Sequence, residues 1–355
     1  MTITKPGSTI GIIGGGQLGR MIANAASELG YKVCIYTDQE NSPASHVAHD
    51  TIVSAYNDKN ALNDFISRVD VITLEFENIP HQTAKQLEEM KILRPGWKIL
   101  HIIQNRLREK DFINSIGIKT APYEEVNSLN SLQKAYAEIE GRCILKTAEF
   151  GYDGKGQFKI NENTDLTQIW NDNNPGNCIL EGMVDFECEI SVVIARGEDG
   201  KTQSYPSVEN RHKDGILDET IAPANINKKT EKQALDIANN IAEKLDIIGV
   251  LAVEMFVMKD GNIMVNELAP RPHNSGHWTM NGSVTSQFEQ LVRAVCGLPL
   301  GSTEIKSKVI MKNLIGDEVN LWEELIKNPN NKIHLYGKQK VRAGRKMGHV
   351  NKLLN

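Results

Sequence analysis

The sequence is poor in cysteine and contains no long hydrophobic run. Its five cysteines are odd in number and show no CxxC spacing, which argues against both a disulfide framework and a zinc site. No apolar stretch approaches the roughly 20 residues of a membrane helix, and Met1 to Thr9 lacks the apolar core of a signal peptide. We therefore expect a cytoplasmic protein with no membrane partner.

An excess of positive charge is also missing. The net charge of −5 provides no general attraction to nucleic acid, so any phosphate-bearing ligand must be held by local groups. What is present is the composition of a globular protein, with 40% hydrophobic and 24% charged residues. At 355 residues the chain is too long for one ordinary core, and we expect two or three domains.

One predicted hairpin carries the clearest chemical signal. Two apolar, β-prone runs flank Asp260-Gly261, a common tight-turn pair. With these two residues as the loop, antiparallel pairing joins Lys259 to Asn262. The same register, continued outward, places Glu254 directly opposite Glu267 on one face of the hairpin.

Opposed carboxylates destabilise a sheet unless a cation lies between them. Oxygen ligands suit Mg²⁺ or Mn²⁺, and Mg²⁺ held by one or two carboxylates commonly takes its other ligands from phosphates and water. Glu254 and Glu267 therefore predict a metal and nucleotide site. Just beyond them, Arg271, His273 and Asn274 form an anion-binding set. The alternative is a register that separates the glutamates and pairs each with a surface lysine.

The chain begins with a βαβ pattern that contains a glycine loop. A short apolar strand precedes Gly14, Gly16 and Gly19 in a GxGxxG arrangement, and Asp38 follows the next strand. This arrangement is typical of NAD binding, yet it also directs backbone N–H groups at any phosphate. The strand 69–74 then leads into Glu75 and the residues after it.

Glu75 and Asn78 follow that strand at the edge of the sheet where open α/β sheets bind ligands. Both could bind sugar hydroxyls. Alternatively, Glu77 and Asn78 cap the helix that begins beyond Pro80.

A lysine and a second glycine loop mark the middle of the chain. Lys146 lies in an apolar strand, where an unpaired cation is rare, so a phosphate partner is attractive. The loop 151–156, GYDGKG, predicts a flexible flap over a triphosphate, although a plain hairpin turn would use the same residues. The backbone of residues 181–184 could bind an adenine edge at a hinge between lobes, or form an ordinary linker.

Three other features have simple structural explanations beside the functional ones. Glu189, in an alternating strand, is a candidate for ribose hydroxyls or belongs to a solvated strand face. A lone histidine such as His212 is usually structural. The basic cluster that contains Lys338 and Arg345 could hold a phosphomonoester, whereas most such clusters are solvated surface.

Together these motifs resemble an ATP-grasp ligase family. Lys146, the GYDGKG loop, residues 181–184, Glu254 and the Asn266-Glu267 pair occur in the order that ATP-grasp ligases use. GGGQLGRM, FENIP, NELAPRPHNSGHWT and GRKMGH narrow the resemblance to the 5-(carboxyamino)imidazole ribonucleotide synthases of purine biosynthesis. The likeness covers nearly the whole chain, although the family usually continues beyond the GRKMGH strand.

The resemblance implies an α/β (α+β) ATP-grasp fold in four parts. These are a βαβ pre-ATP-grasp domain at 1–104, a linker helix and small lid at 105–184, a large domain with the metal hairpin at 185–300, and a C-terminal β segment at 301–355. It implies carboxylation of 5-aminoimidazole ribonucleotide by bicarbonate and ATP through carboxyphosphate, giving ADP and phosphate. A homodimer with small-molecule partners and no nucleic acid is expected, and the first glycine loop would serve the ribonucleotide rather than NAD.

The resemblance also assigns roles residue by residue. ATP contacts would come from Arg106, Lys146, Gly151, Tyr152, Asp153, Gly154, Lys155, Gly156, Gln157, Glu181, Gly182, Met183, Val184, Glu189, His212, Asn266 and Glu267. Glu254 and Glu267 would hold Mg²⁺, with Mn²⁺ as an alternative. The ribonucleotide would meet Gln17, Leu18, Glu75, Asn78, Tyr152, Asp153, Lys338, Arg345 and Lys346, with its phosphate on the last three. Catalysis and bicarbonate binding would fall to Lys146, Asp153, Arg271, His273 and Asn274, and Asp153, His273 or released phosphate would take the amine proton.

Overall fold

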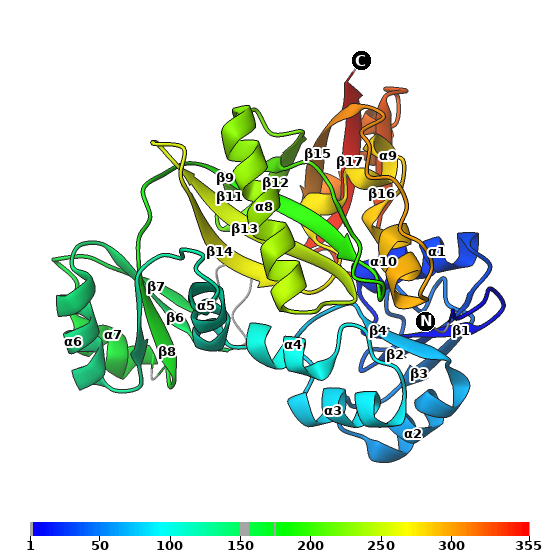
Figure 1. Cartoon of the computed structure of the whole chain (residues 1–355), viewed down its shortest axis with the longest axis horizontal. Coiled ribbons are helices and arrows are strands. Elements are labelled where there is room, and N and C mark those ends of the chain that lie inside the picture. Colours follow the sequence, from blue (N-terminus) through cyan, green and yellow to red (C-terminus); the bar gives the residue numbers. More distant parts are fainter. Residues whose placement is uncertain (1–2, 150–155, 174, 355) are drawn as a thin grey trace.

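The described residues of the protein form three β-sheets (Figure 1). The structure is a computed structural model that describes residues 3–149, 156–173 and 175–354. In Figure 1 the N-terminal sheet lies at lower right, a small sheet at left, and the large sheet between them, with the last strands of the chain at the top. Within the described ranges, no helix combines the length and the apolar character that a membrane crossing demands.

The N-terminal sheet is parallel throughout, as its βαβ pattern predicts. Its elements are β1 (Thr9–Ile13), α1 (Gln17–Glu28), β2 (Lys32–Thr37), β3 (Asp50–Val53), α2 (Lys59–Arg68) and β4 (Val71–Leu74). The strand order is β3-β2-β1-β4. The sequence did not predict β3, because this edge strand is partly exposed and lacks an apolar run.

A small lid follows three connecting helices, α3 (His81–Met90), α4 (Trp97–Ile103) and α5 (Arg106–Ser115). Its elements are β5 (Tyr123–Val126), α6 (Leu129–Ile139), β6 (Cys143–Thr147), β7 (Gln157–Ile160), α7 (Leu166–Asn173) and β8 (Cys178–Gly182). The strands pair antiparallel in the order β5-β8-β6-β7. Leu132 of α6 packs with Leu145 and Leu180 of the sheet, so the lid has a small core of its own.

The large sheet runs β14-β13-β9-β11-β12-β15-β17-β16, with β10 paired to β9. Its strands are β9 (Phe186–Arg196), β10 (Thr202–Ser204), β11 (Val208–Lys213), β12 (Ile216–Ala222), β13 (Gly249–Met258), β14 (Ile263–Ala269), β15 (Lys308–Ile315), β16 (Asn331–Leu335) and β17 (Lys346–Leu354). The helices are α8 (Lys228–Lys244), η1 (Asn274–Gly276), α9 (Thr279–Gly282), α10 (Gln287–Val295), η2 (Gly316–Leu321) and α11 (Trp322–Leu325). Strands of the predicted third and fourth parts thus share one sheet, and the division into domains stays a prediction.

Side chains of the central strands alternate between two cores. On β13, Val250 and Ala252 join the cluster that contains α1 and α10, whereas Leu251 and Val253 join the cluster that contains α8. This alternation follows from the opposite directions of successive side chains on a strand. Because the first cluster also includes Ile10 of β1, the N-terminal sheet and the large sheet share one continuous core.

The acidic hairpin forms as predicted, but its turn has a different register. Met258 N–H donates to the Asn262 carbonyl at 2.8 Å, so the loop is one residue longer than expected and the predicted pairing of Lys259 with Asn262 is wrong. A β-bulge beside Glu254 then shifts the pairing by one residue. Glu254 therefore lies opposite Glu267, and the predicted opposition of the two carboxylates is confirmed.

Candidate active site

The bulge in the hairpin brings oxygen-bearing side chains to one edge of the large sheet. Asn266 is the extra residue on β14, directly before Glu267. Bulges re-aim side chains, and here Asn266 and Glu267 are both partly exposed while the flanking Val265 and Leu268 are buried. Both polar residues are thus held away from the apolar core, and Glu267 is paired with Glu254.

Cations lie beside this acidic group. Arg106 Nη1 is 3.4 Å from Glu267 Oε2. Lys146 Nζ is 2.8 Å, and Lys110 Nζ is 3.6 Å, from Oε2 of Glu181. Glu181 is 4% exposed, and its Oε1 has no hydrogen-bond partner among the described residues. A buried carboxylate oxygen without a donor marks a place where a ligand can supply one.

Sequence reasoning missed two buried charged residues of α5. Glu109 is 3% exposed and Lys110 is 2% exposed. Glu109 Oε1 accepts a hydrogen bond from the Leu268 N–H at 2.7 Å. This bond fixes the backbone of β14 at the residue that follows Glu267. Burial, reinforced by the charge of Glu267, raises the pKa of Glu109. The available signal was a charged pair on the inner face of a helix, where an apolar residue would be ordinary.

Arg271 makes a bidentate ion pair with Glu77, a residue 194 positions away in the sequence. The Nη2 to Oε1 distance is 2.9 Å, and both side chains are mostly buried. Burial tends to raise the pKa of Glu77, but the charge and hydrogen bonds of Arg271 outweigh it and hold that pKa below its usual value. Glu77 therefore binds the predicted anion-site arginine, and its side chain does not cap α3.

The other two members of the predicted anion set lie in the same loop. His273 Nε2 is 2.9 Å from Glu254 Oε1, so the imidazole lies against a carboxylate of the hairpin. Asn274 and Asn313 exchange two hydrogen bonds of 3.0 Å each. Of the three predicted anion-binding residues, the structure thus brings His273 into contact with the carboxylate pair, while Arg271 is oriented by Glu77 and Asn274 by Asn313.

Gln287, which sequence reasoning did not single out, fixes the backbone of this loop at His273. It is fully buried, accepts a hydrogen bond from the His273 N–H and donates to the His273 carbonyl, at 2.9 and 2.8 Å. A Cβ on Gly276 would lie only 2.4 Å from Gln287 Oε1, so the close approach requires glycine there. A buried amide at a helix start has no distinctive sequence pattern, and only the fold reveals its contacts.

The first glycine loop binds a carboxylate of the protein itself. Glu75 accepts hydrogen bonds from the N–H groups of Gly16 and Gly19, at 2.6 and 2.9 Å. Gly14 has a φ of +108°, and a Cβ there would lie 2.2 Å from Glu75 Cγ. Because Glu75 already occupies the N–H groups of Gly16 and Gly19, these groups do not form the predicted phosphate cradle, and the NAD alternative loses the support that they gave it.

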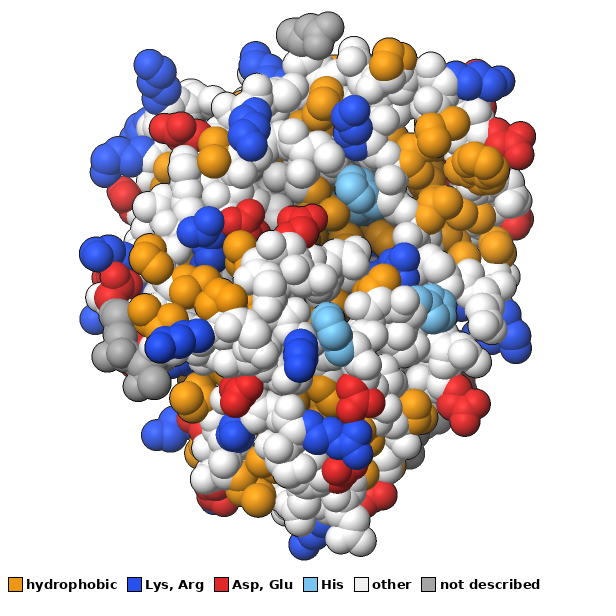
Figure 2. Space-filling view, turned by 90° about the vertical axis from the view of Figure 1, so that its right-hand side faces the viewer, with side chains coloured by type: hydrophobic (Ala, Val, Ile, Leu, Met, Phe, Trp, Pro, Cys, Tyr) orange, Lys and Arg blue, Asp and Glu red, His pale blue; other side chains and the backbone are white. Residues whose placement is uncertain are grey.

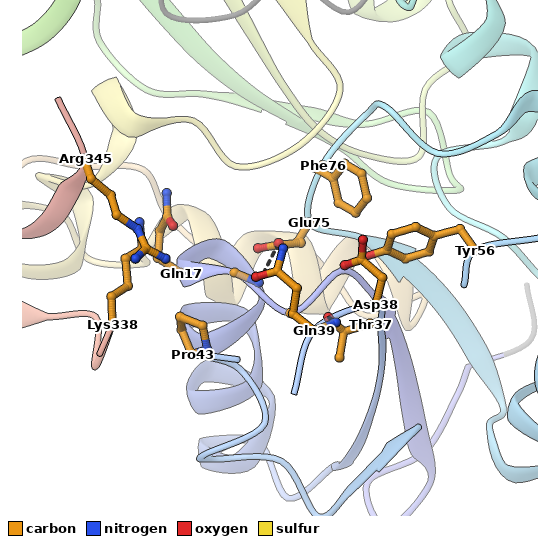
Figure 3. A pocket seen from close by; sticks show the side chains of 12 residues that line it. Gln17, Thr37, Asp38, Gln39, Pro43, Tyr56, Glu75, Phe76, Lys338 and Arg345 are labelled. Carbon is orange, nitrogen blue, oxygen red and sulfur yellow. Dashed lines mark hydrogen bonds between the residues drawn. The ribbon is translucent and has the colours of Figure 1, made fainter. Parts of the chain in front are cut away.

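A pocket opens between this loop and the C-terminal strands (Figure 3). Lys338 and Arg345 form its basic end, and Glu75, Asp38 and Tyr56 lie on the other side of Gln17. The structure therefore brings residues from both ends of the chain to one pocket, and the ribonucleotide as its occupant stays a prediction. Its remaining lining residues are Gly15, Gly16, Thr37, Gln39, Pro43 and Phe76.

Two residues predicted to meet the ribonucleotide have other environments. Lys346 does not line the pocket, but its carbonyl accepts a hydrogen bond from Lys338 Nζ at 2.6 Å and so orients that lysine. Leu18 packs its side chain into the core and is not among the residues that line the pocket. Asn78 is partly exposed beside β4.

The predicted nucleotide residues lie on the lid, on the large sheet and on the segment that joins them. Glu189 Oε2 pairs with His212 Nδ1 at 2.8 Å. The N–H groups of Gly182 and Met183 already bind the carbonyls of Pro122 and Arg142. Val184, Gly156 and Gln157 are partly exposed in the same region, and Gly151, Tyr152, Asp153, Gly154 and Lys155 lie outside the described residues.

A stack of three histidine rings lies behind the loop, and of these His277 and His349 are buried while His334 is partly exposed. The rings of His334 and His349 are 4.5 Å apart at 18°, and His277 lies 4.8 Å from His349. Burial lowers the pKa of all three, that of His334 to about 4. Each ring is therefore neutral in the folded protein at neutral pH.

We expect this stack to make the protein sensitive to acid. The folded pKa of His334 lies below the usual value of 6.5, so its contribution to stability is complete above pH 6.5 and is lost as the pH falls toward about 4. The melting temperature should drop by several degrees over this interval. His334→Gln should flatten the drop, whereas His46→Gln, at an exposed histidine, should not. Identical pH profiles for both variants would contradict the assignment.

Family models match three parts of the chain. An ATP-grasp domain matches residues 111–288, a ribonucleotide synthetase preATP-grasp domain matches 7–104, and a phosphoribosylaminoimidazole carboxylase C-terminal domain matches 309–355. These matches confirm the predicted α/β ATP-grasp fold with its N-terminal and C-terminal parts.

Relatives match over nearly the full chain. The N5-carboxyaminoimidazole ribonucleotide synthase of Brucella melitensis biotype 1 is 47% identical over 355 residues, which cover 99% of this chain and 98% of that protein. The bifunctional purine synthesis protein purC/E of Dictyostelium discoideum is 46% identical, and the chain spans 37% of its length.

Solved structures agree with these matches. An ADP complex of the purK N5-carboxyaminoimidazole ribonucleotide synthetase has a TM-score of 0.97 at 43% identity, covering 100% of this chain and 94% of that one. The N5-carboxyaminoimidazole synthase of Aspergillus clavatus, in complex with ADP and 5-aminoimidazole ribonucleotide, has a TM-score of 0.92 at 30% identity, covering 98% and 94%. The chain belongs to the N5-carboxyaminoimidazole ribonucleotide synthase family of ATP-grasp ligases.

Proposed function

We propose that the protein uses ATP and bicarbonate to carboxylate the amine of 5-aminoimidazole ribonucleotide in purine biosynthesis. The observation that carries this proposal is the opposition of Glu254 and Glu267, with Arg271 and His273 beside them. A relative of known structure binds ADP and this ribonucleotide, and the pocket in Figure 3 is the counterpart we assign to the ribonucleotide. The product would be N5-carboxyaminoimidazole ribonucleotide, with ADP and phosphate.

The donor set of the hairpin suits Mg²⁺. Two carboxylates, from Glu254 and Glu267, and the amide oxygen of Asn266 are hard oxygen ligands, and phosphate and water oxygens would complete the coordination. When bound, the ion would supply charge neutralisation at the transferring phosphate. Arg106, 3.4 Å from Glu267, limits the excess negative charge before nucleotide arrives.

The nucleotide would lie between the lid and the large sheet. Lys146 is positioned by Glu181 to offset charge on phosphate oxygens. Glu181 Oε1, which has no partner among the described residues, would accept a hydrogen bond from the adenine amine, and Val184 would provide the neighbouring backbone contact. Glu189, held by His212, would bind the ribose hydroxyls.

The charge distribution of the second pocket would orient the ribonucleotide. Lys338 and Arg345 attract the phosphate to one end, while Glu75 and Asp38 repel it from the other. Glu75 would then meet the ribose hydroxyls rather than the phosphate. The aminoimidazole would consequently point toward the loop that carries Arg271.

The chemistry follows from the weakness of bicarbonate as an electrophile. Its carbon carries spread negative charge and hydroxide leaves poorly, so oxygen attack on the γ-phosphorus of ATP creates a better leaving group. Arg271 would hold the bicarbonate in line, and its orientation by Glu77 reduces the entropy cost of that alignment. The amine then attacks the carbon of carboxyphosphate, or of the carbon dioxide that it releases, and phosphate departs.

Release of ADP tests the proposal directly. We expect ADP release that requires both 5-aminoimidazole ribonucleotide and bicarbonate. A neighbouring ATP-grasp ligase that activates formate would release ADP with formate instead. Release that is indifferent to bicarbonate would overturn the proposed reaction.

Arg345→Ala should raise the KM for the ribonucleotide about tenfold or more, because a lost charge-assisted contact to phosphate costs about 1.5–3 kcal/mol. The KM for ATP should change little. Arg342→Ala is the matched control, since Arg342 is exposed and does not line the pocket. Equal increases in both KM values would indicate general damage rather than a phosphate contact.

We also propose a cytoplasmic homodimer. Figure 2 shows hydrophobic side chains gathered on one part of the face drawn there. Leu321, Trp322, Ile326 and Leu335 are exposed, and they belong to the segment around α11 and to β16, the edge strand of the large sheet. Apolar surface beside an unpaired strand edge is typical of an interface. Light scattering should give twice the 39.5 kDa mass of one chain.

A further inference from the structure

The imidazole of His273 is held at both nitrogens by groups whose roles are fixed. On one side, the backbone N–H of Ser275 lies 3.3 Å from Nδ1, and a backbone N–H can only donate. On the other side, Nε2 lies 2.9 Å from Oε1 of Glu254, and a carboxylate can only accept. Nδ1 must therefore carry the lone pair, and Nε2 must carry the hydrogen.

A chain of buried polar side chains continues from Nδ1 into the large sheet. Ser275 Oγ lies 2.8 Å from His273 Nδ1 and 2.7 Å from Ser191 Oγ. Asn210 Nδ2 lies 2.9 Å from Ser191 Oγ, and Thr220 Oγ1 lies 3.0 Å from Asn210 Oδ1. Ser191, Ser275 and Thr220 are fully buried and Asn210 is 5% exposed, so water does not compete for these bonds.

The hydrogen bonds in this series of side chains all run in one direction. The hydroxyl of Thr220 donates to the Asn210 carbonyl oxygen, and the Asn210 amide donates to Ser191. Ser191 can then donate to Ser275, and Ser275 to Nδ1 of His273. Every member gives one hydrogen forward, and the last hydrogen, on Nε2, goes to Glu254. Reversal would set the Nε2 lone pair against a carboxylate, which buried surroundings make costly.

We propose that this chain fixes His273 as the Nε2–H tautomer, so that His273 is a hydrogen-bond donor that orients Glu254 and is not the base for the amine. Ser191, Asn210 and Ser275 are then positioning residues for the metal-binding carboxylate. The part about the amine rests on the proposed function, whereas the tautomer does not.

This assignment narrows the route of the amine proton. When the amine nitrogen forms its bond to carbon, it must give up one proton. Nδ1 of His273 is occupied by two donors and Nε2 already carries a hydrogen, so neither ring nitrogen can accept it. The proton must pass to another group, and released phosphate is an acceptor that the reaction itself supplies.

Nitrogen NMR of protein containing ¹⁵N-labelled histidine tests the tautomer without any turnover, because protonated and unprotonated ring nitrogens have very different shifts. The His273 signals are identified by their loss in His273→Gln. We expect an unprotonated Nδ1 and a protonated Nε2 at pH 7.5. An Nδ1–H tautomer or a doubly protonated ring would overturn the proposal, whatever the enzyme's activity.

Asn210→Asp tests the chain, because a carboxylate at this position can only accept and would reverse the donors. We expect the His273 signals to shift toward an Nδ1–H or doubly protonated ring, with a lower kcat. Asn239→Asp is the matched control, since Asn239 also accepts from a threonine, Thr202, and donates to a serine, Ser204, away from the site. Wild-type His273 signals in Asn210→Asp above pH 8 would refute the role of these hydrogen-bonded side chains.

His273→Gln and His273→Ala separate a donor from a base. The glutamine amide can place an N–H near the position of Nε2, so this variant should lose no more than about tenfold in kcat. His273→Ala should lose about a hundredfold. General base catalysis contributes about 10²–10⁴-fold, so a glutamine variant as inactive as the alanine variant would overturn the donor assignment. If ADP release proves independent of bicarbonate while the tautomer is as expected, the proposed reaction fails and the positioning chain stands.

Discussion

Replacing Glu267 with alanine should lower ADP formation about a thousandfold or more, because the ion that we propose Glu254 and Glu267 bind would supply several kcal/mol of charge stabilisation at the transferring phosphate. The fold should survive, since Glu267 is partly exposed and packs no apolar core. Steady-state turnover at saturating ATP and ribonucleotide measures the effect, and circular dichroism with thermal melting verifies the fold.

Glu187→Ala is the matched control for this variant. Glu187 lies on the neighbouring β9 and is exposed, so its loss should leave turnover within about twofold of the wild type, in keeping with the small effects of surface substitutions. Raising the Mg²⁺ concentration should restore only a small part of the activity of Glu267→Ala. Near-normal turnover of Glu267→Ala at ordinary Mg²⁺ would refute the metal role of the hairpin.

Arg271→Gln should abolish most turnover and also destabilise the protein by about 3 kcal/mol, because it leaves the buried Glu77 carboxylate without its ion-pair partner. Loss of activity alone could therefore reflect local damage. The double variant Arg271→Gln with Glu77→Gln removes both charges and allows the two amides to bond to each other.

In the double variant we expect most of the stability to return while turnover stays low, because no guanidinium remains to hold bicarbonate. Glu77→Gln alone should keep part of the activity, since Arg271 is present but less precisely oriented. Urea unfolding gives the stability and ADP release gives the turnover. Recovery of turnover together with stability in the double variant would show that Arg271 acts through the fold alone.

The hairpin shows how a correct pairing can be predicted through an incorrect register. The Asp260-Gly261 pair predicts a two-residue loop, and the actual loop is one residue longer. The bulge at Asn266 shifts the strand by the same amount in the opposite sense, so Glu254 still meets Glu267. Bulges have no reliable sequence signature, and here the shift from the bulge cancelled the shift from the longer turn.

Local patterns predicted many of the strands and helices, though not the edge strand β3, and the order of the motifs, because each depends on residues close together in the chain. Contacts between distant residues could not be obtained in this way. The pair of Glu77 with Arg271 spans 194 positions, and nothing near either residue indicates the other. The phosphate interpretation of the glycine loop was wrong for the same reason. The N–H groups of Gly16 and Gly19 bind Glu75, which the pairing of β1 with β4 brings close to them.

The core that α1 and α10 share with the N-terminal sheet and the large sheet has a mechanical consequence. This core joins the elements that carry the pocket of Figure 3 to those that carry the acidic hairpin. The lid has a separate core around Leu145 and Leu180. We therefore expect ADP to leave by displacement of the lid, without rearrangement of the shared core. With both proposed substrate sites on that shared core, the spacing between the reacting amine and the activated carbonate would be preserved from one catalytic cycle to the next.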